Sequence, residues 1–136
     1  MRFLLDTNVL SELCRKKPSA TVSSWLIQNE LACGISELVI GEMFKGAYRL
    51  SEARRREATL RWINKIEAQF EGRVLPLDLP VLKRWGELCG ESEADGRRLP
   101  VLDSLMAATA LAHELILVTR NRSAFPASVR VLDPWV

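Results

Sequence analysis

The first thirteen residues, MRFLLDTNVLSEL (residues 1–13), place an aspartate directly behind a short apolar run. Residues 3–5 have the character of a buried β-strand, and residues 9–14 predict a short helix. Asp6 therefore stands at the carboxyl end of the first predicted strand. Taken alone, Asp6 is either a cap for the helix that follows or one corner of a charged site.

Behind this opening, short apolar runs alternate with longer segments of helical periodicity. The sequence predicts strands at residues 2–5, 31–36, 73–77 and 115–119, with a last strand within 129–136. It predicts helices at residues 9–14, 19–30, 37–50, 51–72, 79–90 and 101–114, with a polar loop, ESEADGRR, at 91–98. Because strands alternate with helices and the connections are short, we expect an α/β fold with a mainly parallel central sheet.

Length and composition limit the classes of protein to consider. The 136 residues predict one domain, and 48% hydrophobic with 26% charged residues is typical of a globular chain. No apolar run reaches the roughly 18 residues that span a membrane, and an early aspartate argues against a secretory signal. Cys14, Cys33 and Cys89 are odd in number and lack CxxC spacing, so we expect thiols in a reducing cytoplasm. The net charge of +2 does not by itself indicate nucleic acid.

Polar residues occupy positions where a buried sheet or helix does not need them. Asp6 ends the first strand, and Thr119-Arg120-Asn121 follows the strand LILV. In an open parallel sheet, binding sites lie beyond the carboxyl ends of the strands. Glu42 lies inside the apolar helix LVIGEMF, and Asp103 inside PVLDSLMAATALA. A buried carboxylate without a partner or a cation is unfavourable, so these acids need an explanation.

The simplest explanation is that Asp6, Glu42 and Asp103 converge to form an acidic pocket that holds a divalent ion. Several carboxylates together repel one another unless a cation or protons intervene. No histidine or cysteine lies in these motifs, and oxygen-only ligands suit Mg²⁺ or Mn²⁺ rather than zinc. Asn121 and Thr119 would add neutral oxygens at the rim.

Each of these residues also has a plain structural interpretation. Glu42 is able to face solvent or pair with Lys45 on its own helix, and Asp103 is able to cap a helix that starts at Ser104. Asn121 is common in turns and needs no other role. Only the joint pattern favours a site over these separate alternatives.

Three short basic clusters bear on a possible contact with phosphate. The run at residues 54–56 is typical of a solvated helix face, with a phosphate contact as the alternative. Arg97-Arg98 precedes the helix that contains Asp103, and residues 120–122 follow the fourth predicted strand. The last two clusters are therefore better placed than the first to meet a phosphate backbone.

Four segments together resemble the signature segments of PIN domains, and more narrowly the VapC and FitB-type toxins of bacterial toxin–antitoxin pairs: LLDTNVLSEL, ISELVIGEMFKGA, LPVLDSLMAATALAHELILVTRN and VLDPW. The resemblance implies a single PIN domain over residues 1–136, with a three-layer α/β/α sandwich. It also implies a Mg²⁺- or Mn²⁺-dependent ribonuclease that hydrolyses RNA.

The resemblance extends to individual residues. The family's acids fall on Asp6, Glu42 and Asp103, and its fourth position, often Asp, is Asn121 here. Relatives often carry a further acid where this chain has Ala124, which weakens the expectation of a second metal. Thr119 and Arg120 would lie at the rim of the site.

The same resemblance implies partners. Such toxins usually form homodimers and are inhibited by a cognate antitoxin whose C-terminal segment covers the acidic pocket. Operator DNA is bound through the antitoxin and not through the toxin.

Three other functions fit the sequence less well. A phosphatase with Asp6 as nucleophile needs an acid at position 8, where this chain has Asn8. A receiver domain needs an acidic pair at the first strand end and a late lysine, and Arg120 stands in that turn. A PIN-like module that binds RNA or protein without cutting is the main alternative to an enzyme.

Overall fold

A computed structural model describes all 136 residues, Met1–Val136. Its centre is a sheet of five strands in the order β3-β2-β1-β4-β5, and every neighbouring pair is parallel. The strands are β1 Phe3–Leu5, β2 Cys33–Ser36, β3 Val74–Leu75, β4 Ile116–Val118 and β5 Val131–Leu132. The predicted α/β class is confirmed, and the sheet is wholly rather than mainly parallel.

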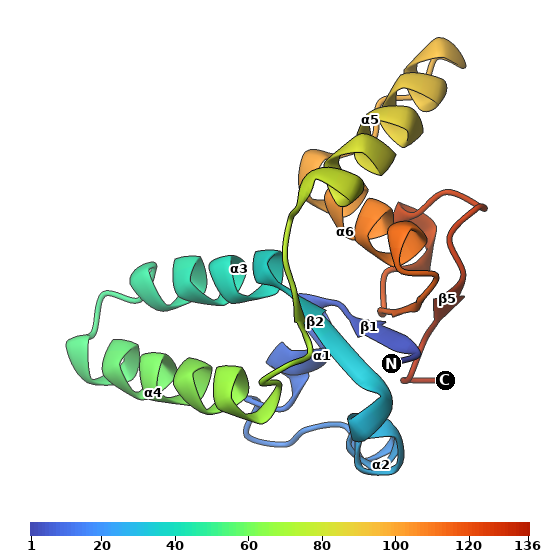
Figure 1. Cartoon of the computed structure of the whole chain (residues 1–136). Helices are drawn as coiled ribbons and strands as arrows, with labels where there is room; N and C mark the ends of the chain where they lie inside the picture. Colours follow the sequence, from blue (N-terminus) through green and yellow to red (C-terminus); the bar gives the residue numbers. More distant parts are fainter.

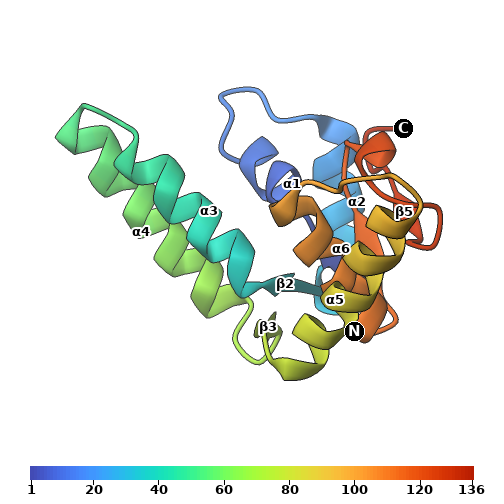
Figure 2. The same ribbon diagram turned by 90° about the horizontal axis from the view of Figure 1, so that it is seen from above.

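Six α-helices and two 3₁₀ helices connect these strands. They are α1 Thr7–Glu12, α2 Ala20–Asn29, η1 Glu30–Ala32, α3 Glu37–Tyr48, α4 Ala53–Gln69, α5 Leu79–Ala94, α6 Val101–Ala112 and η2 Arg122–Ala124. Helices α5 and α6 lie above the strands and α2 lies below them, which confirms the three-layer sandwich (Figure 1). The hairpin of α3 and α4 extends outward on the side opposite α5 and α6 (Figure 2). None of the helices is both long and apolar enough to cross a membrane.

The strand order places a switch point between the central strands β1 and β4, where successive connections turn to opposite sides of β1. From β1 the chain moves to β2 and β3 on one side, and then returns to β4 on the other side of β1. The Asp6 backbone N–H donates to the Val118 carbonyl oxygen at 2.9 Å, so the carboxyl ends of β1 and β4 lie together. Ligand sites in such sheets form at this switch point.

The core explains why the central strands are largely apolar. Helices cover both faces of a parallel sheet, so consecutive residues of β1 and β2 are all buried, whereas the edge strands β3 and β5 are half-buried. Leu4, Leu5, Leu117 and Val118 are fully buried within one cluster of 23 apolar residues. The sheet is therefore a rigid base for residues that lie just beyond its ends.

One arginine holds the start of β2 in place. The Arg73 guanidinium donates to the carbonyl oxygens of Glu30 and Cys33, both at 2.6 Å, and to that of Gln69 at 2.9 Å. It also pairs with the Glu30 carboxylate at 3.1 Å and stacks over the Phe70 ring at 4.8 Å. These partners compensate the burial of the charge. Burial also raises the pKa of the Cys33 thiol to about 12.

Several predicted element boundaries differ from the structure by two residues or more; the strand predicted at 31–36, for example, begins at Cys33. Two of these differences have a clear physical cause. Helix α1 begins at Thr7 rather than at position 9, because the Asp6 side chain caps it directly. Helix α5 continues to Ala94, through half of the predicted loop 91–98. Alanine and glutamate favour helix, and the helix ends where Gly96 adopts a φ of +81°, a conformation that glycine tolerates best.

We predict that Leu117→Ala lowers the free energy of unfolding by roughly 2–5 kcal/mol, because it leaves a cavity in the central strand pair. Urea denaturation measures this change. Leu31→Ala is the matched control, since Leu31 is 85% exposed, and its effect should stay within about 0.5 kcal/mol. Equal losses for the two variants would contradict this description of the core.

Candidate active site

Asp6 joins the ends of β1 and β4 through its two carboxylate oxygens. Oδ1 accepts a hydrogen bond from the Thr7 backbone N–H at 2.8 Å and thereby caps α1. Oδ2 accepts from the Thr119 hydroxyl, also at 2.8 Å. The two interpretations of Asp6 are therefore compatible, because the residue is both a helix cap and part of a polar cluster.

Thr7 connects Asp6 to Glu42. Its N–H bonds to Asp6, and its hydroxyl donates to Oε1 of Glu42 at 2.8 Å. Glu42 lies in α3, 35 residues away in sequence, and forms no ion pair with Lys45. Thr7 was not predicted as a site residue, although its place directly behind Asp6 was a usable signal.

Asn8 fixes the turn that follows β4. Its Nδ2 donates to the Thr119 hydroxyl oxygen at 3.0 Å, and its Oδ1 accepts from the Arg120 backbone N–H at 3.3 Å. The Asn121 N–H also donates to the Thr119 hydroxyl oxygen, at 3.1 Å. Thr119 thus donates one hydrogen bond, to Asp6, and accepts two, which satisfies its fully buried hydroxyl. The role of Asn8, like that of Thr7, was not predicted from the sequence.

Asp103 faces the same cluster from α6. It is the third residue of that helix, whose N-cap is Pro100, so the interpretation of Asp103 as a cap is wrong. Burial, and then the negative charge of Asp6, raise the pKa of the Asp103 carboxyl above its usual value. The two carboxylates are therefore close enough to repel, and a cation between them would relieve that repulsion.

The structure brings the three predicted acids to one region but does not arrange them as a complete ligand set. No three side chains among His, Cys, Asp and Glu are grouped closely enough to hold a metal ion. Asp103 lies close enough to Asp6 for the charge of Asp6 to raise the pKa of the Asp103 carboxyl, whereas Glu42 is linked to Asp6 through Thr7. The donors are all oxygens, which is the chemistry that Mg²⁺ or Mn²⁺ prefers. The side chain of Asn121 is exposed at the rim.

Two further charged side chains, Arg120 and Glu12, are each held by defined partners. The Arg120 guanidinium lies 5.0 Å from the centre of the Trp135 ring. Glu12 is 5% exposed and accepts hydrogen bonds from the Ser19 N–H and from Arg15. The hydrogen bond from the Ser19 N–H lowers the pKa of the Glu12 carboxyl, and the charges of Arg15 and Arg120 act in the same direction. Burial acts against them. Glu12 was missed, although an acid inside VLSEL gave the same signal as Glu42.

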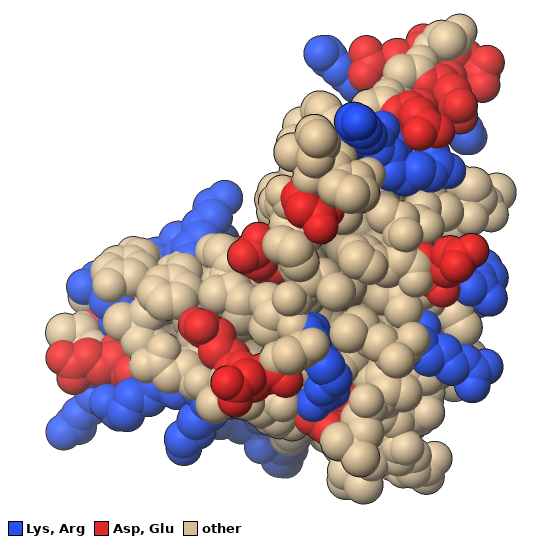
Figure 3. Space-filling view, in the orientation of Figure 1, with Lys and Arg blue, Asp and Glu red and all other residues tan.

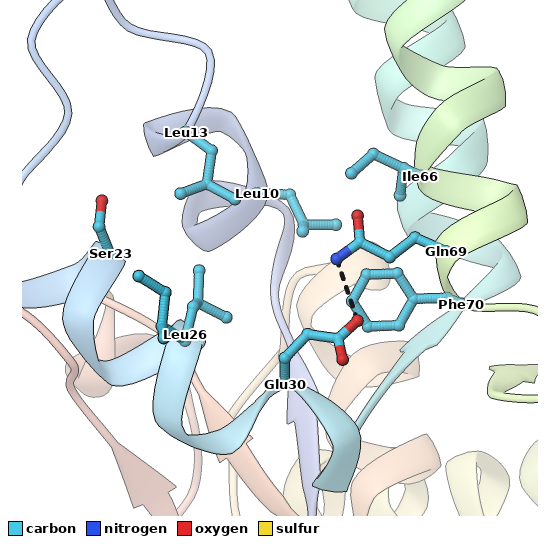
Figure 4. Close-up of a pocket in the computed structure, with 9 residues that line it drawn as sticks. Leu10, Leu13, Ser23, Leu26, Glu30, Ile66, Gln69 and Phe70 are labelled. Carbon is cyan, nitrogen blue, oxygen red and sulfur yellow. Dashed lines mark hydrogen bonds between the residues drawn. The ribbon is translucent and has the colours of Figure 1, made fainter.

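A different pocket, of about 280 Å³, lies between α1, α2 and α4. Figure 4 shows its mainly apolar lining, which includes Leu10, Leu26 and Phe70, with one hydrogen bond from Gln69 to Glu30. None of the predicted site residues lines it. This pocket therefore lacks the groups for the chemistry that the acidic cluster suggests.

Comparison with known proteins agrees with this geometry. Residues 3–127 match the PIN domain family. The chain is 30% identical to VapC ribonuclease Y4jK of Sinorhizobium fredii, in an alignment that covers 97% of this chain and 96% of that relative. It is 33% identical to toxin FitB of Neisseria gonorrhoeae, with 97% of each chain covered. A solved structure of FitAB bound to a DNA fragment has a TM-score of 0.90 and 31% identity, covering 98% of this chain and 96% of that one.

We predict that Asp103→Asn stabilises the metal-free protein at neutral pH. The raised pKa means that ionised Asp103 is disfavoured in the folded state, so removing the charge should increase the melting temperature. This advantage should shrink as the pH falls through the raised pKa of Asp103 and vanish below the usual carboxyl pKa of about 3.9, where the wild-type group is protonated in both states.

Thermal unfolding in EDTA across this pH range measures the effect. Asp95→Asn, at the exposed end of α5, removes the same charge without the facing carboxylate and should give no such pH dependence. A lower melting temperature for Asp103→Asn at pH 7 would show that Asp6 and Asp103 do not repel.

Proposed function

Since the chain belongs to the PIN domain family, and within it to the VapC and FitB-type toxins, we propose that it is a divalent-metal-dependent endoribonuclease. The observation that supports this most directly is that Asp103 lies within the electrostatic influence of Asp6, which stands at the switch point of the sheet. The name of the Sinorhizobium relative, a VapC ribonuclease, gives the substrate class. We extend that class, RNA, to this chain.

The residues present suit a Mg²⁺ or Mn²⁺ ion. Asp6 and Asp103 would hold it. Burial, and then the charge of Asp6, raise the pKa of the Asp103 carboxyl, and a bound cation would favour its ionised form. When bound, such an ion supplies a polarised phosphoryl oxygen and a water of lowered pKa. Thr119 and Asn8 hold Asp6 in one orientation, so the carboxylate needs little reorganisation on binding.

Glu42 has a separate role in this proposal. Thr7 takes up its Oε1 and leaves Oε2 to orient a water or a second ion. Asn121 and Thr119 complete the rim. Because water attacks phosphorus and the RNA 2′-hydroxyl takes no part, cleavage should leave a 5′-phosphate and a 3′-hydroxyl.

The partners implied by the sequence remain part of the proposal. We expect a cognate antitoxin, with operator DNA bound through it, because the FitAB assembly of similar fold is bound to DNA. Exposed apolar side chains at the starts of α5 and α6 would support a homodimer, since Leu79 and Val101 are 63% and 62% exposed. The three unpaired cysteines suit a reducing compartment such as the cytoplasm.

We predict that Asp6→Asn reduces RNA cleavage by more than about 100-fold, because a metal-holding carboxylate is lost. Asparagine keeps an oxygen for the Thr7 N–H and loses the acceptor of the Thr119 hydroxyl, while the backbone pairing of β1 with β4 is unchanged, so the fold should persist. Cleavage of a labelled RNA with Mn²⁺ and circular dichroism measure the two effects, and Asp95→Asn is the control. Full activity in a folded Asp6→Asn protein would remove Asp6 from the mechanism.

A metal titration separates the enzyme from an inactive PIN-like module. We predict that Mn²⁺ or Mg²⁺ raises the melting temperature of the wild type, since an ion at 100 times its Kd stabilises the folded state by about 2.7 kcal/mol. Asp103→Asn should lose this shift. If neither ion changes the melting temperature and no RNA is cut, the chain is an inactive module.

A further inference from the structure

A pocket of about 370 Å³ lies between the α5–α6 connection and the turn after β4. We call it the arginine niche; its lining residues are Arg97, Arg98, Leu99, Pro100, Ser123, Ala124, Phe125 and Pro126. Each wall continues into the candidate active site. Pro100 caps the helix whose third residue is Asp103, and Ser123 lies two residues beyond Asn121. The niche therefore adjoins the proposed site of cleavage.

The niche is positively charged without an internal counter-ion. Arg97 and Arg98 are exposed, neither forms an ion pair, and no acid lines the pocket. A neighbouring pocket contains Arg122 and Arg130, but it is also lined by an acid, Asp133. The guanidiniums of Arg122 and Arg130 donate to backbone carbonyl oxygens, so they are less available to an anion.

The walls of the niche are held by the backbone. Gly96 adopts a φ of +81°, and the Arg97 N–H donates to the Ser92 carbonyl oxygen at 2.8 Å, which fixes the direction of the α5–α6 connection. On the other wall, the Ala124 N–H donates to the Asn121 carbonyl oxygen at 3.1 Å. A pre-formed site loses less entropy when it binds a ligand.

The remaining lining is apolar and partly aromatic. Leu99 and Phe125 are half-buried and pack against the main core, so their outer surfaces are presented on a firm support. A free phosphate would bind the arginines and leave the apolar lining without a role. A nucleotide uses both features, because its phosphate binds guanidinium and its base stacks on an aromatic ring.

We propose that the arginine niche binds the RNA nucleotide that neighbours the cleaved phosphodiester. Arg97 and Arg98 contact phosphates, and Phe125 contacts the base. The acidic cluster repels an RNA strand, so adjacent cations are needed to hold that strand across it. This inference rests on the proposed ribonuclease function and adds the position at which the RNA strand is bound.

The test measures binding without cleavage. A fluorescein-labelled 12-nucleotide single-stranded RNA of mixed sequence is titrated with the full chain in EDTA at several salt concentrations, and the Kd follows from anisotropy. For single strands, removing one arginine that neutralises a phosphate lowers the magnitude of the slope of log K against log salt by about 0.7. We expect R97Q/R98Q to lower it by about 1.4, and Phe125→Leu to weaken binding about tenfold with the slope unchanged.

The double variant R54Q/R55Q is the matched control, because it removes the same charge from α4, on the hairpin where basic side chains gather (Figure 3). An equal decrease of slope in the two double variants would overturn the niche and leave the nuclease proposal intact. A loss of polyglutamate binding but not of RNA binding in R97Q/R98Q would make the niche a protein-docking site and also overturn it. Failure of the wild type to cut RNA with Mn²⁺ would refute the ribonuclease, whatever the binding result.

Discussion

The hydrogen bond between the Thr119 hydroxyl and Oδ2 of Asp6 joins two strand ends that are 113 residues apart. It forms because β1 and β4 are parallel neighbours whose carboxyl ends coincide. The hydrogen bond from the Asp6 N–H to the Val118 carbonyl oxygen holds these two ends together. Asn8 then links the same hydroxyl to the backbone of Arg120. The acidic cluster depends on this junction, since α1, which Asp6 caps, also places Thr7 against Glu42.

The fold was largely predictable, because its signals are strong and local. Continuous apolar runs such as LILV are typical of parallel strands that are buried on both faces. The predicted helix start at residue 79 is the observed start of α5, which Asp78 caps. The failure at 91–98 has a simple physical origin. Polar composition suggested a loop, but glutamate and alanine are good helix formers, and only the positive φ of Gly96 ends the helix.

The candidate site was predicted less completely. Carboxylates in apolar segments revealed Asp6, Glu42 and Asp103, because unpaired buried charge is unfavourable wherever it occurs. The hydroxyl and amide groups of Thr7 and Asn8 gave no such signal, since short polar residues at a helix start are ordinary. Their roles depend on partners from α3 and from the turn after β4, and the sequence alone does not show that these segments lie beside Thr7 and Asn8. The buried Glu12 shows that the same signal also marks a structural acid, which serves the Ser19 backbone.

The central position of β1 has a consequence for how the chain matures during translation. The first strand to leave the ribosome needs two neighbours, and its pairing with β4 waits until residues 116–118 have been made. Contacts of such long sequence separation form late. Asp6 therefore has no Thr119 partner until most of the polypeptide exists, and a prematurely terminated product lacks the junction altogether. A nascent chain that has not yet reached Thr119 therefore lacks the geometry of the acidic cluster.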